Sequence, residues 1–325
     1  MAFARNWRQA WVSETPERVS VREIPALNAV FSEAFTERYR RDGMVGVRVP
    51  HLNPSVWKFA ITDAEGGAMI WRNARDGIAA FNMIHRSGVE GWMGPLAVHS
   101  DYQGQGVGKM IVSSGVEWLK KAGAKVIGLE TMPRTMDNVG FYSALGFAPG
   151  HLTLTVTLEA ARAGIQAATM SSLNPHEREL AIRQCRLLVD QLAPGYDYTR
   201  EIVLTAQHLL GDTLFVRKGS DVVSFAVCHS VPLVEGRVTE EMRVLKMVAK
   251  TEADFDQLVM QLCAHARVKS ARRVAIRVQG QYGDIYRRLV ARGARVRWTD
   301  LRMALHDYAE ARPVNGGIVL SNWEI

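Results

Sequence analysis

A glycine-rich turn between an apolar segment and an amphipathic one is the feature of this sequence that most restricts its fold. The segment LAVHSDYQGQGVGKMIV covers residues 96–112 and contains Gly104, Gly106 and Gly108. Glycine weakens a helix or a strand by about 0.5–1 kcal/mol per position. Three glycines this close together therefore indicate that the turn has a role beyond connecting two elements.

The segments on either side of the turn have the patterns of a strand and a helix. Residues 92–98, WMGPLAV, carry no charge and are typical of a buried strand. In residues 109–123 apolar side chains recur at helical spacing, and the final glycine is a usual stop signal. The first N–H groups of such a helix have no intrahelical partner and lie at the positive end of its dipole. Because glycines let an anion approach the main chain closely, this unit predicts a phosphate-binding site.

Two common nucleotide motifs do not fit the turn. The dinucleotide fingerprint GxGxxG needs a glycine where Lys109 stands, and the P-loop GxxxxGK[ST] needs a glycine at Gln103 and a hydroxyl at Met110. The spacing that remains is Gln-x-x-Gly-x-Gly, formed by Gln103, Gly106 and Gly108. A glycine turn without a ligand is the structural alternative.

This pattern resembles the loop of the GCN5-related N-acetyltransferase (GNAT) superfamily that wraps the pyrophosphate of coenzyme A. The next segments are similar in order: an apolar strand over 125–132, then DNVGFYSALGFAPG over 137–150, which matches the family's Asn…Tyr…Gly-Phe pattern, and an alternating strand over 151–159. The close resemblance covers residues 92–158. A looser upstream match includes SVREI at 20–24 and predicts a helix over 26–40 and strands over 56–62, 66–73 and 78–85.

The second half of the chain repeats this order without its chemistry. Strands are predicted over 242–248, 272–278 and 295–305, with helices over 253–268 and from 283 onward. Tyr286 and Leu289 echo Tyr142 and Leu145 at one common offset. No glycine occurs between 236 and 280, and the segment that replaces the phosphate loop is acidic, with Glu252, Asp254 and Asp256.

These features predict an α/β (α+β) fold of two tandem GNAT-like domains. The resemblance implies that each is a mixed, mostly antiparallel sheet with a splayed pair of parallel strands, flanked by helices. We expect a catalytic domain over residues 1–160 and a degenerate domain without a phosphate loop over 169–325, linked near 159–168. The second domain would cover a sheet edge of the first and shape one wall of the acceptor site.

The resemblance implies a set of residues that bind acetyl-CoA. The pantetheine arm would lie between the splayed strands and bond the backbone of the first strand, and Asn138 would bond the arm. The predicted cofactor-binding residues are Leu96, Ala97, Val98, Gln103, Gly104, Gln105, Gly106, Val107, Gly108, Lys109, Asn138 and Phe141. A simple helix N-cap is the structural alternative for Asn138.

The resemblance also assigns the proton donor to Tyr142. A phenol with a pKa of about 10 can donate to a forming thiolate with a pKa of about 8–9 across a short hydrogen bond. Packing of its ring beside Phe141 and Phe147 is the alternative role.

The general base has several candidates. Glu130 ends the strand after the glycine-loop helix, and in parallel sheets that end faces the ligand crevice. Glu90 and His85 are rivals from neighbouring strands. A chain of water molecules could also take the proton, which would leave no single base.

Composition narrows the partners. The net charge of +7 is spread over both halves rather than gathered in a tail, so we expect no nucleic-acid partner. The three cysteines form no CxxC pair, which predicts a reducing compartment and no metal site. Neither an apolar run of about 20 residues nor a signal-peptide core is present, so we expect a cytoplasmic protein without a membrane partner.

The predicted activity is transfer of an acetyl group from acetyl-CoA to the amine of a small molecule. The protein would be a monomer with two similar halves or a homodimer. A non-catalytic acyl-CoA-binding regulatory protein and an acetyltransferase that modifies a protein are the alternatives. The acceptor amine itself has no motif in the sequence, and acyl groups other than acetyl stay open.

Overall fold

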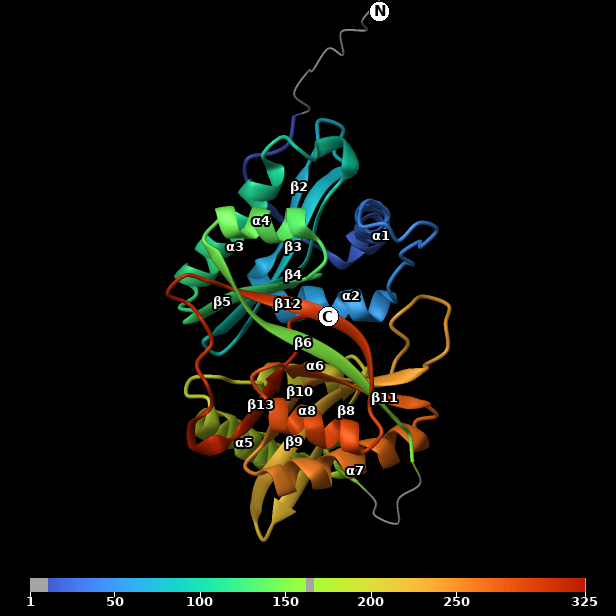
Figure 1. Cartoon of the computed structure of the whole chain (residues 1–325), viewed down its shortest axis with the longest axis vertical. Coiled ribbons are helices and arrows are strands. Elements are labelled where there is room, and N and C mark those ends of the chain that lie inside the picture. The colour runs from blue at the N-terminus through green and yellow to red at the C-terminus, as the bar shows by residue number, and fades with distance from the viewer. Residues whose placement is uncertain (1–10, 162–166, 325) are drawn as a thin grey trace, which may run out of the picture.

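The structure is a computed structural model that describes residues 11–161 and 167–324. Its main feature is one curled, mixed sheet of 13 strands with helices on both faces (Figure 1). The first half contributes β1 (Glu17–Arg18), α1 (Ile24–Arg41), α2 (Pro54–Ala64), β2 (Ala68–Arg72), β3 (Ile78–Ser87), β4 (Glu90–Val98), α3 (Val107–Lys121), β5 (Val126–Thr131), α4 (Met136–Ala144) and β6 (Phe147–Glu159).

The second half continues the same sheet. Its elements are β7 (Ala168–Thr169), α5 (Pro175–Leu192), α6 (Thr199–Gln207), β8 (Gly211–Lys218), β9 (Asp221–His229), β10 (Glu241–Ala249), α7 (Glu252–Val268), β11 (Arg273–Gln279), α8 (Gly283–Ala291), β12 (Arg295–Leu305) and β13 (Ile318–Ser321). Part of the predicted link, residues 162–166, lies outside the described residues. Within the described ranges, no helix combines the length and the apolarity needed to cross a bilayer.

The two halves exchange their long last strands. The strand order is β1-β2-β3-β4-β5-β12-β6-β11-β10-β9-β8-β7, with β13 paired to β10. Thus β12, from the second half, lies between β5 and β6, while β6, from the first half, pairs with β11 of the second. Figure 1 shows β6 and β12 side by side across the middle of the molecule. Each half therefore completes its sheet with a strand from the other half.

Apolar helix faces cover the sheet in both halves. On one face of the first half, α1 and α2 bury Leu27 and Trp57 against Phe81 of β3. On the other face, α3 buries Ile111 and Leu119. In the second half α7 and α8 pack on one face, and α5 and α6 on the other. The predicted α/β architecture of two GNAT-like units is confirmed.

Most predicted elements are confirmed, but the strand expected over 56–62 is wrong, because this segment is helix α2. The reason is local. The side chain of Asn53 caps the helix by accepting a hydrogen bond from the N–H of Ser55, and Pro54 stands at the first helical position. The buried residues Val56, Trp57, Phe59 and Ala60 then follow helical rather than alternating spacing.

The proposed echo of Tyr142 by Tyr286 is also wrong. Helices α4 and α8 each have nine residues. Each is followed at the same distance by a glycine with φ +90, Gly146 and Gly293. When the ends of the two helices are aligned, the position in α8 that is equivalent to Tyr142 is Leu289, which is fully buried. The second half therefore has a packing residue where the first has a phenol.

Candidate active site

A cavity lies where β4 and β5 diverge. These parallel strands pair from Glu90↔Val126 to Met93↔Leu129. Beyond that point β4 remains paired with β3, while the end of β5 pairs with β12. A cavity of about 650 Å³ fills the gap and is lined by residues 93–98 of β4 and by Glu130 and Thr131 of β5. The splayed strand pair predicted from the sequence is therefore present.

The main chain of β4 offers hydrogen-bonding groups to this cavity. The N–H of His99 donates to the carbonyl of Ala79 at 2.9 Å. Because hydrogen-bonded and non-bonded pairs alternate in an antiparallel ladder, Ala97 bonds to β3, whereas Leu96 and Val98 direct their N–H and C=O groups away from it. The Val98 carbonyl accepts a hydrogen bond from Nε2 of Gln103 at 2.9 Å, which ties the start of the glycine loop to the strand.

The glycine loop has a backbone that requires glycine. Gly104 and Gly106 have φ of +75 and +83, and a Cβ at either position would meet no heavy atom within 4 Å. The main chain there is thus open on its outer side. Gly106 is the residue before α3, so the N–H groups of the first α3 residues have no intrahelical acceptor. The ring of Phe141 lies 3.3 Å from the position of a Cβ on Gly108 and closes the inner side.

The cavity brings most of the predicted site residues together. Those that line it are Leu96, Ala97, Val98, Gln103, Gly104, Gly108, Glu130, Asn138, Phe141 and Tyr142. Gln105, Gly106, Val107 and Lys109 lie in the adjoining loop and helix start, outside the lining. Asn138 is the third residue of α4, whose N-cap is Thr135, and its Nδ2 donates to Oγ1 of Thr131 at 3.4 Å. Asn138 is therefore not a helix cap.

Tyr142 combines both roles considered for it. Its ring contacts Phe141 and Phe147, with centroid distances of 5.1 and 6.1 Å, and it is only 7% exposed. Its hydroxyl has no hydrogen bond to another described residue, although the side chain lines the cavity. Burial raises the pKa of the phenol, so Tyr142 keeps its proton at neutral pH.

Glu130 lies in a buried ionic cluster rather than free in the cavity. Its carboxylate accepts hydrogen bonds from Arg277 at 2.7 Å and from Arg302 at 3.0 Å. Burial works to raise the pKa of Glu130, but the two guanidinium charges and the hydroxyl of Thr153 outweigh it and lower the pKa to about 2. A carboxylate held this firmly in its ionised form is a weak proton acceptor at neutral pH.

The rival bases are turned away from the cavity. Oδ2 of Asp63 lies 2.6 Å from Nδ1 of His85, whose ring stacks on Trp92 at 4.1 Å. Burial lowers the pKa of His85. The Glu90 carboxylate accepts hydrogen bonds from Lys246 and from the indole of Trp323. Neither His85 nor Glu90 lines the cavity.

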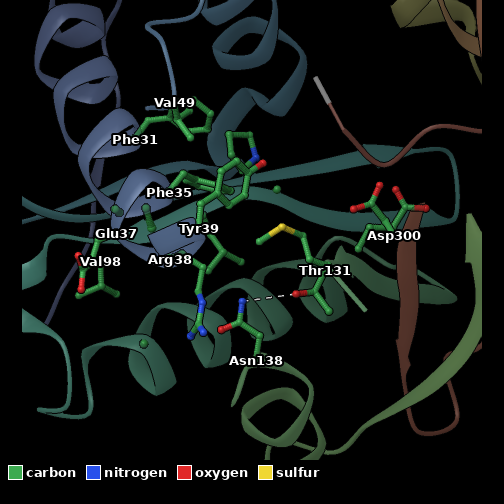
Figure 2. Close-up of a pocket in the computed structure, with 18 of the residues that line it drawn as sticks. Phe31, Phe35, Glu37, Arg38, Tyr39, Val49, Val98, Thr131, Asn138 and Asp300 are labelled. Carbon is green, nitrogen blue, oxygen red and sulfur yellow. Dashed lines mark hydrogen bonds between the residues drawn. The ribbon is translucent and has the colours of Figure 1, made fainter. Parts of the chain in front are cut away.

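The second half supplies one wall of the cavity; the sequence predicted such a wall but not the residues that form it. Five of its residues line the cavity: Leu233, Trp298, Asp300, Trp323 and Glu324. The opposite wall comes from α1, and Figure 2 shows its Phe31, Phe35 and Tyr39 on one side of the pocket and Asp300 on the other. The alternating pattern over 295–305 predicted a strand there, but nothing local indicated that this strand joins the sheet of the first half.

Comparisons with known proteins agree with this geometry. Residues 29–147 match the model of the acetyltransferase (GNAT) family, so the first half of the chain contains a GNAT domain. No curated protein matches the chain in sequence.

Solved structures match nearly the whole chain. A candidate acetyltransferase from Pyrococcus horikoshii has a TM-score of 0.65 and 13% identity over 99% of this chain and 98% of its own. A tandem GNAT protein from the clavulanic acid biosynthesis pathway has a TM-score of 0.57 and 11% identity, over 93% and 100%. Saccharomyces cerevisiae N-myristoyltransferase with bound myristoyl-CoA has a TM-score of 0.61 and 10% identity, over 92% and 80%. At these identities the likeness establishes the tandem GNAT fold alone.

Proposed function

We propose that the protein is an acetyl-CoA-dependent N-acetyltransferase that acetylates a small amine. The observation that carries this proposal is the cavity between β4 and β5. Both the glycine loop and Tyr142 contribute to its lining. We also propose that residues 1–160 form the catalytic unit and that residues 169–325 form a second unit without a phosphate loop. The proposed location is cytoplasmic.

The residues present fit acetyl-CoA, which supplies an acetyl group activated as a thioester. The open main chain at Gly104 and Gly106, followed by the free N–H groups of α3, suits a pyrophosphate. The outward N–H and C=O groups of Leu96 and the outward N–H of Val98 suit the amide groups of the pantetheine arm. Tyr142 would donate its proton to the departing sulfur, because its phenol lines the cavity and is protonated at neutral pH.

A non-catalytic acyl-CoA-binding protein is the second candidate. It would need the same loop but would have no use for a buried, unpartnered phenol in the cavity. That feature favours catalysis. An acetyltransferase acting on a protein is the third candidate, and it is less favoured because α1 and the second half enclose the cavity on opposite sides.

Binding and turnover test the proposal together. Calorimetric titration with coenzyme A should give one site per chain, and Gly106→Asp should abolish it, because a side chain and a negative charge would then face the phosphates. Gly123→Asp is a matched control, since Gly123 also has a positive φ of +81 in open space but lies at the far end of α3. Incubation with acetyl-CoA and a panel of amines should release free thiol. Binding that persists in Gly106→Asp would overturn the loop assignment.

A further inference from the structure

The wall of the cavity that the second half supplies is rich in carboxylates. Arg277 alone contacts three of them: Glu130 at 2.7 Å, Asp300 at 3.0 Å and Glu324 at 2.8 Å. Arg302 contacts Glu130 again and also Glu310. Four carboxylates thus share two guanidinium groups. Of the four, Glu130, Asp300 and Glu324 line the cavity, whereas Arg277, Arg302 and the nearby Arg243 do not.

Glu324 differs from the other carboxylates of this cluster in its access to the cavity. The side chains of Glu130 and Asp300 are 1% and 5% exposed, whereas that of Glu324 is 48% exposed. One oxygen of Glu324 accepts a hydrogen bond from Arg277, and the other has no hydrogen-bond partner among the described residues. Glu324 therefore presents a free oxygen to a ligand.

Aromatic rings stand beside this carboxylate. The rings of Tyr39, on α1, and Trp298, on β12, lie 6.2 Å apart. Both line the cavity, and the indole N–H of Trp298 donates to Asp300 at 3.1 Å. Burial raises the pKa of Tyr39, and the charges of Glu324 and Asp300 add to the rise; all three residues line the same cavity. Aromatic faces next to carboxylates are the usual surroundings of a bound organic cation.

The cationic side chains that line the cavity do not neutralise these carboxylates. Arg38 and Arg41, from α1, also line it, but they pair with Asp42 and Glu37. Tyr142, only 7% exposed and without a hydrogen-bond partner among the described residues, lines the same cavity. The cavity thus has a neutral proton donor and an anionic aromatic wall.

We propose that the acceptor is a cationic amine bound between Tyr39, Trp298 and Asp300, and that Glu324 takes the ammonium proton before the nitrogen attacks. This inference rests on the proposed acetyltransferase function and names its substrate class and its base. The transfer breaks one N–H bond of the ammonium and forms an O–H bond on Glu324, which leaves a neutral amine and a neutral carboxyl group. Glu324 then returns the proton to water at the exposed side of its carboxyl.

The surroundings of Glu324 suit this exchange at neutral pH. Partial burial of its carboxyl raises the pKa to about 7, against the opposing charge of Arg277 on β11. Asp300 on β12 and Glu130 on β5 add to the rise, and Arg243 on β10 opposes it. A group with a pKa near the working pH both accepts and releases a proton readily.

A binding experiment tests the acceptor site without any turnover. Benzylamine, which is cationic at pH 8, and its neutral isostere benzyl alcohol are titrated into the full chain, with the fluorescence of cavity tryptophans or heat as the signal. We expect the cation to bind at least tenfold more tightly, and Glu324→Gln to remove most of that preference. Glu235→Gln is the matched control, a 54%-exposed carboxylate of the second half outside the cavity lining. Equal binding of the two probes to the wild-type protein would overturn the proposal.

A kinetic experiment tests the proton transfer. With saturating acetyl-CoA, kcat/KM for an alkylamine should fall below an apparent pKa of about 7, and Glu324→Gln should lose this acidic limb together with about 10²–10⁴-fold of the rate at pH 7.5. An aniline, which is already neutral at that pH, should lose less than tenfold. Equal losses for both amines, or an unchanged alkylamine rate, would contradict the role of Glu324. If the protein binds benzylamine selectively but acetylates no amine, the cation site is supported and the acetyltransferase function is refuted.

Discussion

The two halves of the molecule contain the same pair of parallel strands and use the space beside it in opposite ways. In the first half β4 and β5 part after Met93↔Leu129, and a cavity opens. In the second half β10 and β11 part after Arg243↔Ala275, but β13 occupies the gap and pairs with β10 from Lys246↔Ser321 to Ala249↔Ile318. The chain therefore fills one of the two gaps between its parallel strands with its own backbone.

The helices that follow β4 and β10 also differ, because the start of α3 is open and the start of α7 is capped. Helix α3 begins after Gly106, with an open backbone. Helix α7 begins after Thr251, whose hydroxyl accepts a hydrogen bond from the N–H of Asp254, and its first turn also carries Glu252. Capped N–H groups and carboxylates oppose a phosphate. The two halves thus differ in one loop and one strand rather than in the fold.

The segment that fills the gap between β10 and β11 also contributes to the lining of the cavity in the first half. After β13 the chain continues to Trp323 and Glu324, which line the cavity of the first half. The indole of Trp323 donates to Glu90 on β4, and Lys246 on β10 donates to the same carboxylate and to Ser321. A hydrogen-bond network thus joins the filled gap to the open one.

The largest expected effect comes from separating the halves. A fragment of residues 1–164 loses β11 and β12, which are both neighbours of β6, and leaves one edge of β5 unpaired. We expect it to be insoluble or to self-associate, as measured by size-exclusion chromatography with light scattering. Co-expression with residues 165–325 should restore a soluble complex. A monodisperse, active 1–164 monomer would show that the exchanged strands are dispensable.

Tyr142→Phe tests the chemical difference between the halves. The substitution keeps the ring and its packing but removes the proton, so kcat at saturating acetyl-CoA should fall by about 10²–10⁴-fold while coenzyme A affinity and the melting temperature stay close to wild type. Tyr286→Phe, at the position in α8 that only superficially echoes it, should leave kcat unchanged. Wild-type turnover by Tyr142→Phe would demote Tyr142 to a packing residue.

Glu130→Gln separates a structural role of this carboxylate from a catalytic one. The substitution breaks the buried ion pairs of Glu130 with Arg277 and Arg302, and breaking a buried ion pair typically costs about 3–5 kcal/mol of stability. Urea unfolding at pH 7 measures the loss, and Glu179→Gln, in an exposed pair with Arg183, should change little. Intact stability with abolished turnover would instead support Glu130 as the base.

The pH dependence of that loss has a defined sign. The pKa of Glu130 is about 2 in the folded protein, below its ordinary value of 4.5. Its ionised form therefore contributes stability above about pH 4.5, and that contribution disappears as the pH falls toward 2. The stability difference between wild type and Glu130→Gln should accordingly narrow in acid. A difference that stays constant from pH 7 to pH 3 would contradict the lowered pKa.

What the sequence predicts here is local. The glycine spacing, the uncharged strand before it and the helix after it all depend on nearest neighbours, so β4, α3, β5 and α4 follow from the pattern. The exchange of β6 and β12 does not, because both strands alternate in the same way and either could complete either sheet. Glu324 and Trp323 carry no motif, and they reach the cavity only because β13 pairs with β10.

The smallest expected effect concerns the strand that fills the second gap. The hydroxyl of Tyr282 donates to the carbonyl of Val319 at 2.9 Å and accepts from the N–H of Val319 at 3.2 Å, which fixes the middle of β13. Tyr282→Phe removes both bonds, and we expect a stability loss of about 1 kcal/mol, measured by thermal or urea unfolding.

Coenzyme A binding by this variant tests whether β13 alone closes the second gap. Loosening β13 exposes part of the second gap, but the capped, acidic start of α7 still opposes the pyrophosphate. Calorimetric titration of Tyr282→Phe should therefore still give one site per chain with wild-type affinity. A second site would mean that β13 alone closes the gap and that the carboxylates of α7 tolerate a phosphate. Because Tyr282 lies outside the cavity of the first half, a change in the first site would instead have to pass through the Lys246–Glu90 network.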